Sequence, residues 1–149
     1  MMTKTRRMAT ILTILVLGIG SVFAAPASAG TASSTTAQAT CTGSSSCWFT
    51  WGRITAGDCT LDGAKWTLFP NGSASFEARL VSSDSNDAWL MWVNLLDSAG
   101  VVLGPIHHGG NPKFVKGTVK NQWHWWFDAG SFDARFYDRI NGMRMTSHC

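Results

Sequence analysis

Charged side chains are scarce in this sequence. They make up 14% of its 149 residues, and Glu77 is the only glutamate. Three of the 12 basic residues (Lys4, Arg6 and Arg7) lie in an N-terminal leader, so the rest of the chain carries nine basic and nine acidic residues. A net charge of zero removes the usual electrostatic basis for binding nucleic acid or an anionic membrane. The hydrophobic content of 45% indicates a packed globular domain instead.

Motifs that indicate catalysis or a metal site are also missing. The sequence contains no Cys-x-x-Cys, His-Glu-x-x-His or Gly-x-Ser-x-Gly pattern, and no glycine-rich phosphate loop. Asp84, Asn86 and Asp87 carry oxygen ligands, but without the glycine and distal glutamate of a calcium loop they predict an Asx-rich turn. Glycoside hydrolysis normally needs two carboxylates, and we expect Glu77 on the solvated side of a strand. We therefore expect no metal and no cofactor, and we favour a non-catalytic protein.

The N-terminus has the three parts of a cleavable export signal. The basic residues are followed by an apolar stretch over residues 11–25 and by a small-x-small site at Ala27-Ser28-Ala29. A membrane-spanning helix needs about 20 apolar residues, and this stretch is shorter and interrupted by small and polar residues. We expect residues 1–29 to be removed and the protein to be secreted, by the general or the twin-arginine route. No membrane association is expected after cleavage.

Four cysteines follow the leader, an even number that predicts two disulfides in an exported protein. One arrangement pairs Cys59 with Cys149 and Cys41 with Cys47. The rival arrangement pairs Cys47 with Cys59 across a hairpin and Cys41 with Cys149. Sequence spacing does not choose between these two arrangements.

Composition divides the exported chain into two parts. Residues 30–46 have no charge and no aromatic side chain, and ten of them are serine or threonine. This segment predicts a flexible leader that buries too little surface to fold. We therefore expect a single disulfide-stapled β domain over residues 47–149.

The domain reads as short β-strands separated by turn residues. Asn71-Gly72 predicts one hairpin, and residues 97–100 predict a second. Towards the C-terminus the spacing of apolar residues favours a short helix near residues 132–141, with Ser131 as its N-cap, followed by a last strand. The expected fold is mainly β: one antiparallel sandwich or meandering barrel of about eight strands with one short C-terminal helix.

Five short segments stand out together with the export signal: Phe49-Thr50-Trp51, Gly57-Asp58-Cys59, residues 88–92, residues 113–117 and Ser147-His148-Cys149. In these segments the chain resembles a family of small secreted actinobacterial proteins of unknown function. The resemblance covers most of residues 47–149, implies secretion and a Cys59–Cys149 disulfide, and carries no activity or binding residue.

Eight tryptophans are an unusual number for a chain of this length. In a strand over residues 122–127, Trp123, Trp125 and Phe127 share one face, and His124 and Trp126 share the other. We expect the face with three aromatic side chains to be core. The mixed face is then the better candidate for a wet or ligand-lined surface.

Adjacent histidines raise the possibility of a metal site, but His107 and His108 lie among turn residues, and we expect them to be solvated in a loop over residues 107–112. The candidate ligand-binding residues are therefore Trp126, His124, His107 and His108.

These observations favour a secreted, non-catalytic binding module for an extracellular glycan, peptide or small apolar molecule. The alternative is a secreted inhibitor or toxin-like interaction protein that works through the 107–112 loop, and a small hydrolase has the least support.

Overall fold

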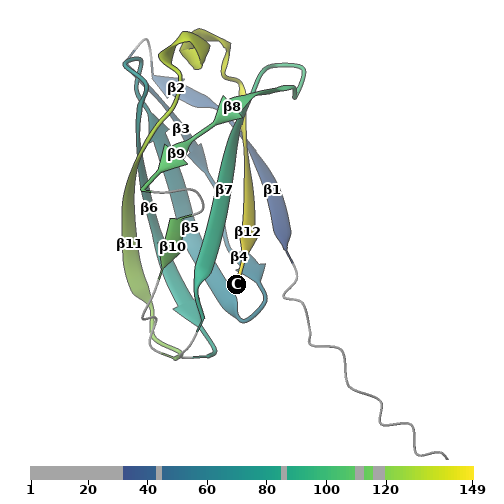
Figure 1. The fold of residues 1–149 in the computed structure, drawn as a ribbon, viewed down its shortest axis with the longest axis vertical. Helices are drawn as coiled ribbons and strands as arrows, with labels where there is room; N and C mark the ends of the chain where they lie inside the picture. The colour runs from purple at the N-terminus through teal and green to yellow at the C-terminus, as the bar shows by residue number, and fades with distance from the viewer. Residues whose placement is uncertain (1–31, 43–44, 85–86, 110–112, 116–119) are drawn as a thin grey trace, which may run out of the picture.

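Two antiparallel β-sheets pack face to face in the computed structural model (Figure 1). The structure describes residues 32–42, 45–84, 87–109, 113–115 and 120–149. Of the two expected architectures, the sandwich of two sheets is the one observed. The described residues hold more strands than the eight expected, because several are only two to four residues long. The expected export signal, residues 1–29, lies outside the described residues.

The first sheet, sheet A, joins the two ends of the described chain. Its strand order is β1-β12-β7-β10, with β8 paired to β7, and every pairing is antiparallel. The strands are β1 (Ser33–Gln38), β7 (Trp89–Leu96), β8 (Val102–Pro105), β10 (Lys113–Val115) and β12 (Gly142–His148).

The second sheet, sheet B, is built around the long β5–β6 hairpin. Its strand order is β2-β3-β5-β6-β11-β9, with β4 paired to β5. The strands are β2 (Thr40–Thr42), β3 (Ser46–Thr50), β4 (Ile54–Ala56), β5 (Cys59–Leu68), β6 (Ser73–Ser82), β9 (His107–His108) and β11 (His124–Ser131).

Both predicted hairpins are present, and local turn chemistry accounts for each. Between β5 and β6, Gly72 has a φ of 82°, and the Asn71 side-chain oxygen accepts a hydrogen bond of 3.0 Å from the Ser73 amide. Between β7 and β8, Gly100 has a φ of 77°, and the Asp97 carboxylate accepts from backbone amides within the turn. Glycine reaches positive φ without a Cβ clash, so each turn forms at its expected place.

The expected flexible leader over residues 30–46 is wrong for the part that the structure describes. Strand β1 pairs with β12 along its whole length, from Ser33 opposite Ser147 to Gln38 opposite Gly142. Backbone amides and carbonyls make these ladder bonds whatever the side chains are, so a polar segment can form an edge strand. Ala37, which points inward, packs against the core. The folded domain therefore begins before residue 47.

The short C-terminal helix is a 3₁₀ helix, η1 (Ala134–Arg139). The expected N-cap, Ser131, belongs to β11, and Asp133 caps the helix by accepting a hydrogen bond of 3.0 Å from the Arg135 amide. No residue within η1 is buried, whereas Phe132 and Ile140 are buried on either side of it. The apolar spacing therefore reflects two buried residues, Phe132 and Ile140, that flank a short helix.

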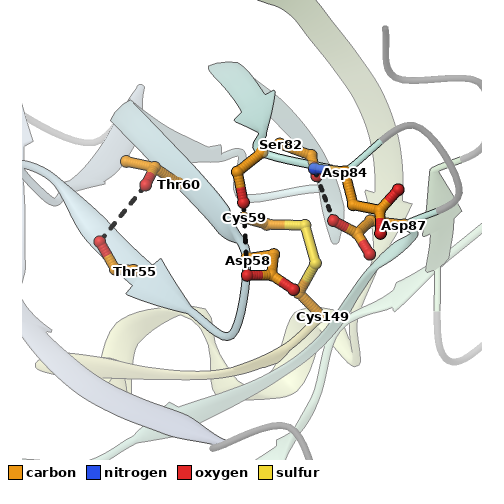
Figure 2. Close-up of a disulfide and its surroundings, with 9 residues drawn as sticks. Thr55, Asp58, Cys59, Thr60, Ser82, Asp84, Asp87 and Cys149 are labelled. Atoms are coloured by element: carbon orange, nitrogen blue, oxygen red, sulfur yellow. Dashed lines mark hydrogen bonds between the residues drawn. A yellow bond between two sulfur atoms is a disulfide. The ribbon is translucent and has the colours of Figure 1, made fainter. Parts of the chain in front are cut away.

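A disulfide between Cys59 and Cys149 ties the sheets together (Figure 2). Cys59 begins β5 of sheet B, Cys149 follows β12 of sheet A, and their Cα atoms are 5.8 Å apart. This is the pairing that the family resemblance implied, and it excludes the rival pairing of Cys47 with Cys59. Cys47 also lies in a disulfide, and its backbone partner across β2 and β3 is Cys41.

Aromatic and aliphatic side chains from both sheets fill the space between them. Strands β5, β6 and β7 supply most of this core by placing alternate residues inward. The largest fully buried hydrophobic side chains are Trp66, Trp89, Phe49, Leu61, Leu68, Leu80, Met91, Leu95, Ile106, Met143 and Met145.

Candidate ligand-binding surface

Strand β11 turns its faces the opposite way from the sequence prediction. Trp126 is buried, with 7% of its surface exposed, and its ring meets that of Phe76 edge-on at 4.8 Å between centroids. Trp125 and Phe127 are 64% and 66% exposed. The expectation that Trp123, Trp125 and Phe127 form core is therefore wrong, and so is the expectation of a wet face at Trp126.

The neighbouring strand explains this orientation. Strands β6 and β11 pair without a register shift, and Trp126 lies opposite Ala78. Paired residues in adjacent strands point to the same side of a sheet, and alternate residues of β6, including Phe76 and Ala78, point into the core. The small Ala78 side chain leaves room for the large Trp126 ring.

Two outward side chains of β11, together with Trp123 directly before the strand, form an exposed row along the outer side of sheet B. We call Trp123, Trp125 and Phe127 the aromatic face. The Trp125 and Phe127 rings stack on each other, with centroids 5.7 Å apart and planes inclined by 12°. Stacking of this kind restricts the rotamers of both side chains before any ligand arrives. The row therefore presents an ordered apolar surface to solvent.

Two arginines hold the third ring of the row. The guanidinium carbons of Arg79 and Arg53 lie over the Trp123 ring, 5.2 Å and 5.9 Å from its centroid. Arg79 also forms an ion pair with Asp62 across β5 and β6. Cation–π contacts at exposed sites contribute about 0.5–1 kcal/mol each. They leave Trp123 less exposed, at 42%, than the other two members of the row.

A hollow of about 360 Å³ lies beside the aromatic face. Its outward side chains come from three adjacent strands and the turn after β5, and they combine apolar rings with hydroxyl, amine and carboxylate groups. Lys65 and Glu77 form an ion pair of 3.6 Å within it. The lining residues are Lys65, Thr67, Phe69, Ser75, Phe76, Glu77, Phe127 and Asp128.

Most of these lining residues were not predicted from the sequence to belong to a binding site. The expectation that Glu77 faces solvent is confirmed, since its side chain is 47% exposed. Phe69 and Lys65 were missed because their significance depends on pairing with residues on other strands. The available signal was the alternation in β5, which places Lys65 and Thr67 on one side and extends to Phe69 directly after the strand.

The four candidate ligand-binding residues do not come together at this surface. His107 and His108 form strand β9, which pairs with the end of β11, so they point to opposite sides of the sheet. His107 is exposed, His124 is half-buried, and Trp126 is in the core.

The expectation of a solvated His108 is wrong. Its ring is buried, donates a hydrogen bond of 3.1 Å from Nδ1 to the Asp128 carboxylate, and lies 5.7 Å from the Trp66 ring. This polar contact belongs to the inner side of sheet B.

The two carboxylates beside the hollow are not arranged as a catalytic pair. Glu77 points outward. Asp128 directly follows the exposed Phe127 in β11, so it points to the inner side of the sheet, and its side chain is only 6% exposed. Its oxygens accept hydrogen bonds from His108 and from the Ala129 amide. General acid–base hydrolysis needs carboxyl groups on either side of one scissile bond, and these two lie on opposite sides of a sheet.

A compact group of potential metal ligands occurs at the disulfide. Ligand atoms of Cys59, Asp87 and Cys149 lie within 4.8 Å of one another. The two sulfurs are bonded to each other, so neither is a thiolate ligand. Asp87 instead accepts a hydrogen bond from the buried Ser82 hydroxyl (Figure 2). The Asp84 amide donates to the same hydroxyl, as expected of a turn, and residues 85–86 lie outside the described residues.

Comparison with known proteins places the chain in a family without assigning it an activity. Neither the curated proteins nor the solved structures contain a significant match. In the part of the chain that the structure describes, we find no helix of a length and hydropathy suited to crossing a bilayer. A family match covers residues 65–149, from the middle of β5 to the C-terminus, which is more than half of the sequence. The chain belongs to this family, the family of unknown function DUF6294.

Proposed function

We propose that this protein is a secreted, non-catalytic binding module whose binding surface is the outer side of sheet B. The observation that carries the proposal is the stacked pair of Trp125 and Phe127, both about two-thirds exposed, beside a hollow lined with polar groups. Large aromatic side chains are normally placed in the core or at an interface. An ordered and exposed pair is therefore best explained by a partner that covers it.

The chemistry of the surface favours a carbohydrate ligand. A sugar ring has an apolar face that stacks on an aromatic side chain and a rim of hydroxyl groups that donate and accept hydrogen bonds. The hollow supplies both roles, with donors on Lys65, hydroxyls on Thr67 and Ser75, and an acceptor on Glu77. Its volume lies in the range of small-molecule sites rather than of flat protein interfaces.

A protein partner is the second candidate. Tryptophan, phenylalanine and arginine are enriched at the centre of protein interfaces, and the row of Trp123, Trp125 and Phe127 with Arg53 and Arg79 has that composition. This composition keeps the inhibitor or interaction-protein hypothesis in view, with the aromatic face in place of the 107–112 loop. Of the residues expected in that loop, His107 and His108 are described and form strand β9, which pairs with β11.

The binding proposal is tested with a glycan array and a pull-down from culture supernatant. We expect the mature protein to bind glycans on the array, and the double variant Trp125→Ala, Phe127→Ala to lose that signal. The matched control is Val101→Ala, which truncates a 60% exposed apolar side chain on the β7–β8 hairpin. Capture of a protein with no glycan signal would favour the interaction-protein alternative. Undiminished glycan binding by the double variant would place the site elsewhere.

Secretion is a separate part of the proposal. It is supported by the N-terminal export signal and by the disulfide between Cys59 and Cys149. We expect the intact mass of the protein from culture supernatant to begin at Gly30. A cell-retained protein that begins at Met1 would contradict it.

A further inference from the structure

The charged side chains around the aromatic face are unevenly compensated. Lys65 pairs with Glu77, and Arg79 pairs with Asp62. Arg53 is exposed, and among the described residues no carboxylate lies within ion-pair distance of it. The surface therefore has an unmatched positive charge, and it lies at the Trp123 end of the row.

The position of Arg53 suits it to an anionic group on a ligand. Its guanidinium lies over the Trp123 ring, which limits the orientations that the side chain samples. A guanidinium is planar and holds its N–H donors in one plane. Those donors match the two oxygens of a carboxylate or sulfate in a bidentate contact.

The aromatic face is also too long for a single sugar ring. Trp123 directly precedes β11 and lies four residues from Phe127, a spacing that is about 13 Å in an extended chain. The hollow lies at the Phe127 end, and Arg53 lies at the Trp123 end. A ligand that reaches both features must be an oligomer, with a ring against Phe127 and an acidic group at Arg53.

We propose that the ligand is an acidic polysaccharide, with an anionic substituent bound by Arg53 beside Trp123 and a sugar ring stacked at Trp125 and Phe127. This inference rests on the proposed carbohydrate-binding function and specifies its ligand class. The shared chemistry is an anionic group on a sugar chain, and both carboxylate and sulfate have it.

The test compares polymers that differ only in charge. Isothermal titration calorimetry measures binding of the mature protein to oligogalacturonate and to its methyl ester, and to dextran sulfate and dextran. We expect at least one anionic form to bind about tenfold more tightly than its neutral counterpart at low salt. We expect high salt to reduce that preference, because the contact is exposed. The anionic polymer that shows the preference identifies carboxylate or sulfate.

The variant Arg53→Gln is the decisive reagent. We expect it to reduce binding of the preferred anionic polymer to about the level of the neutral counterpart. The melting temperature should fall only slightly, because the exposed side chain loses only its cation–π contact with Trp123. The control is Arg139→Gln, which removes an exposed cation from η1, and we expect it to keep the full preference.

Either of two results in these titrations would overturn the inference and leave the function intact: equal affinity for charged and neutral polymers, or a preference that survives in Arg53→Gln. Glycan binding confined to neutral sugars on the array would do the same. Absence of binding to every glycan would instead remove the proposed function itself.

Discussion

The two faces of β11 carry the same kinds of side chain and have opposite roles. On the inner face, Trp126 packs against Phe76 above the small Ala78, and on the outer face Trp125 and Phe127 stack in solvent. Aromatic content alone therefore does not identify the core side of a strand. The side is set by the neighbouring strand, because β6 has a clear apolar face and β11 must match it.

The largest expected effect sharpens this comparison from the inner side. We expect Trp126→Ala to lower the free energy of unfolding by about 3–5 kcal/mol, because it leaves a cavity in a packed core. Chemical denaturation of the wild type and the variant measures this difference. A loss below about 1 kcal/mol would mean that Trp126 is not a core residue.

The next effect concerns the polar contact on the same inner side. We expect His108→Ala to cost about 1–3 kcal/mol, because the Asp128 carboxylate loses the hydrogen bond from Nδ1 in a buried site. The control is His107→Ala, which removes the exposed histidine of the same strand and should change stability by less than about 0.5 kcal/mol. Equal losses in the two variants would contradict the burial difference between them.

The sequence predicted those features of the fold that depend on neighbouring residues, and it missed those that depend on distant strands. Asn71-Gly72 and Gly100 specify turns through their own backbone preferences, so both hairpins were predictable. The pairing of β1 with β12 was not, because a serine- and threonine-rich strand held by backbone bonds has no apolar alternation to reveal it. The orientation of β11 was also missed, because it depends on register with a strand more than forty residues earlier.

The candidate site follows the same rule. Glu77 was correctly placed on a solvated face, because β6 alternates strictly. The hollow combines β5, β6 and β11, and no single stretch of sequence contains it. The contact of Arg53 with Trp123 joins residues seventy positions apart, so only the folded chain brings them together.

A smaller effect is expected at Trp123, the partly covered end of the aromatic face. Trp123 is partly covered by Arg53 and Arg79, so we expect Trp123→Ala to cost about 1 kcal/mol through loss of two exposed cation–π contacts. Trp123→Phe retains an aromatic face and should recover part of that loss. Thermal unfolding of the three proteins measures the difference. Identical stability of all three would show that the arginines do not hold the ring.

The smallest expected effect is the sharpest test of the comparison. Trp125 is 64% exposed, and its described ring contact is with Phe127, which is itself exposed. Trp125→Ala should therefore change the free energy of unfolding by less than about 0.5 kcal/mol. Measured beside Trp126→Ala, it compares adjacent tryptophans of one strand under identical conditions. A loss as large as that of Trp126→Ala would mean that the outer face is covered in the folded protein, and a surface open to ligand would no longer explain its aromatic side chains.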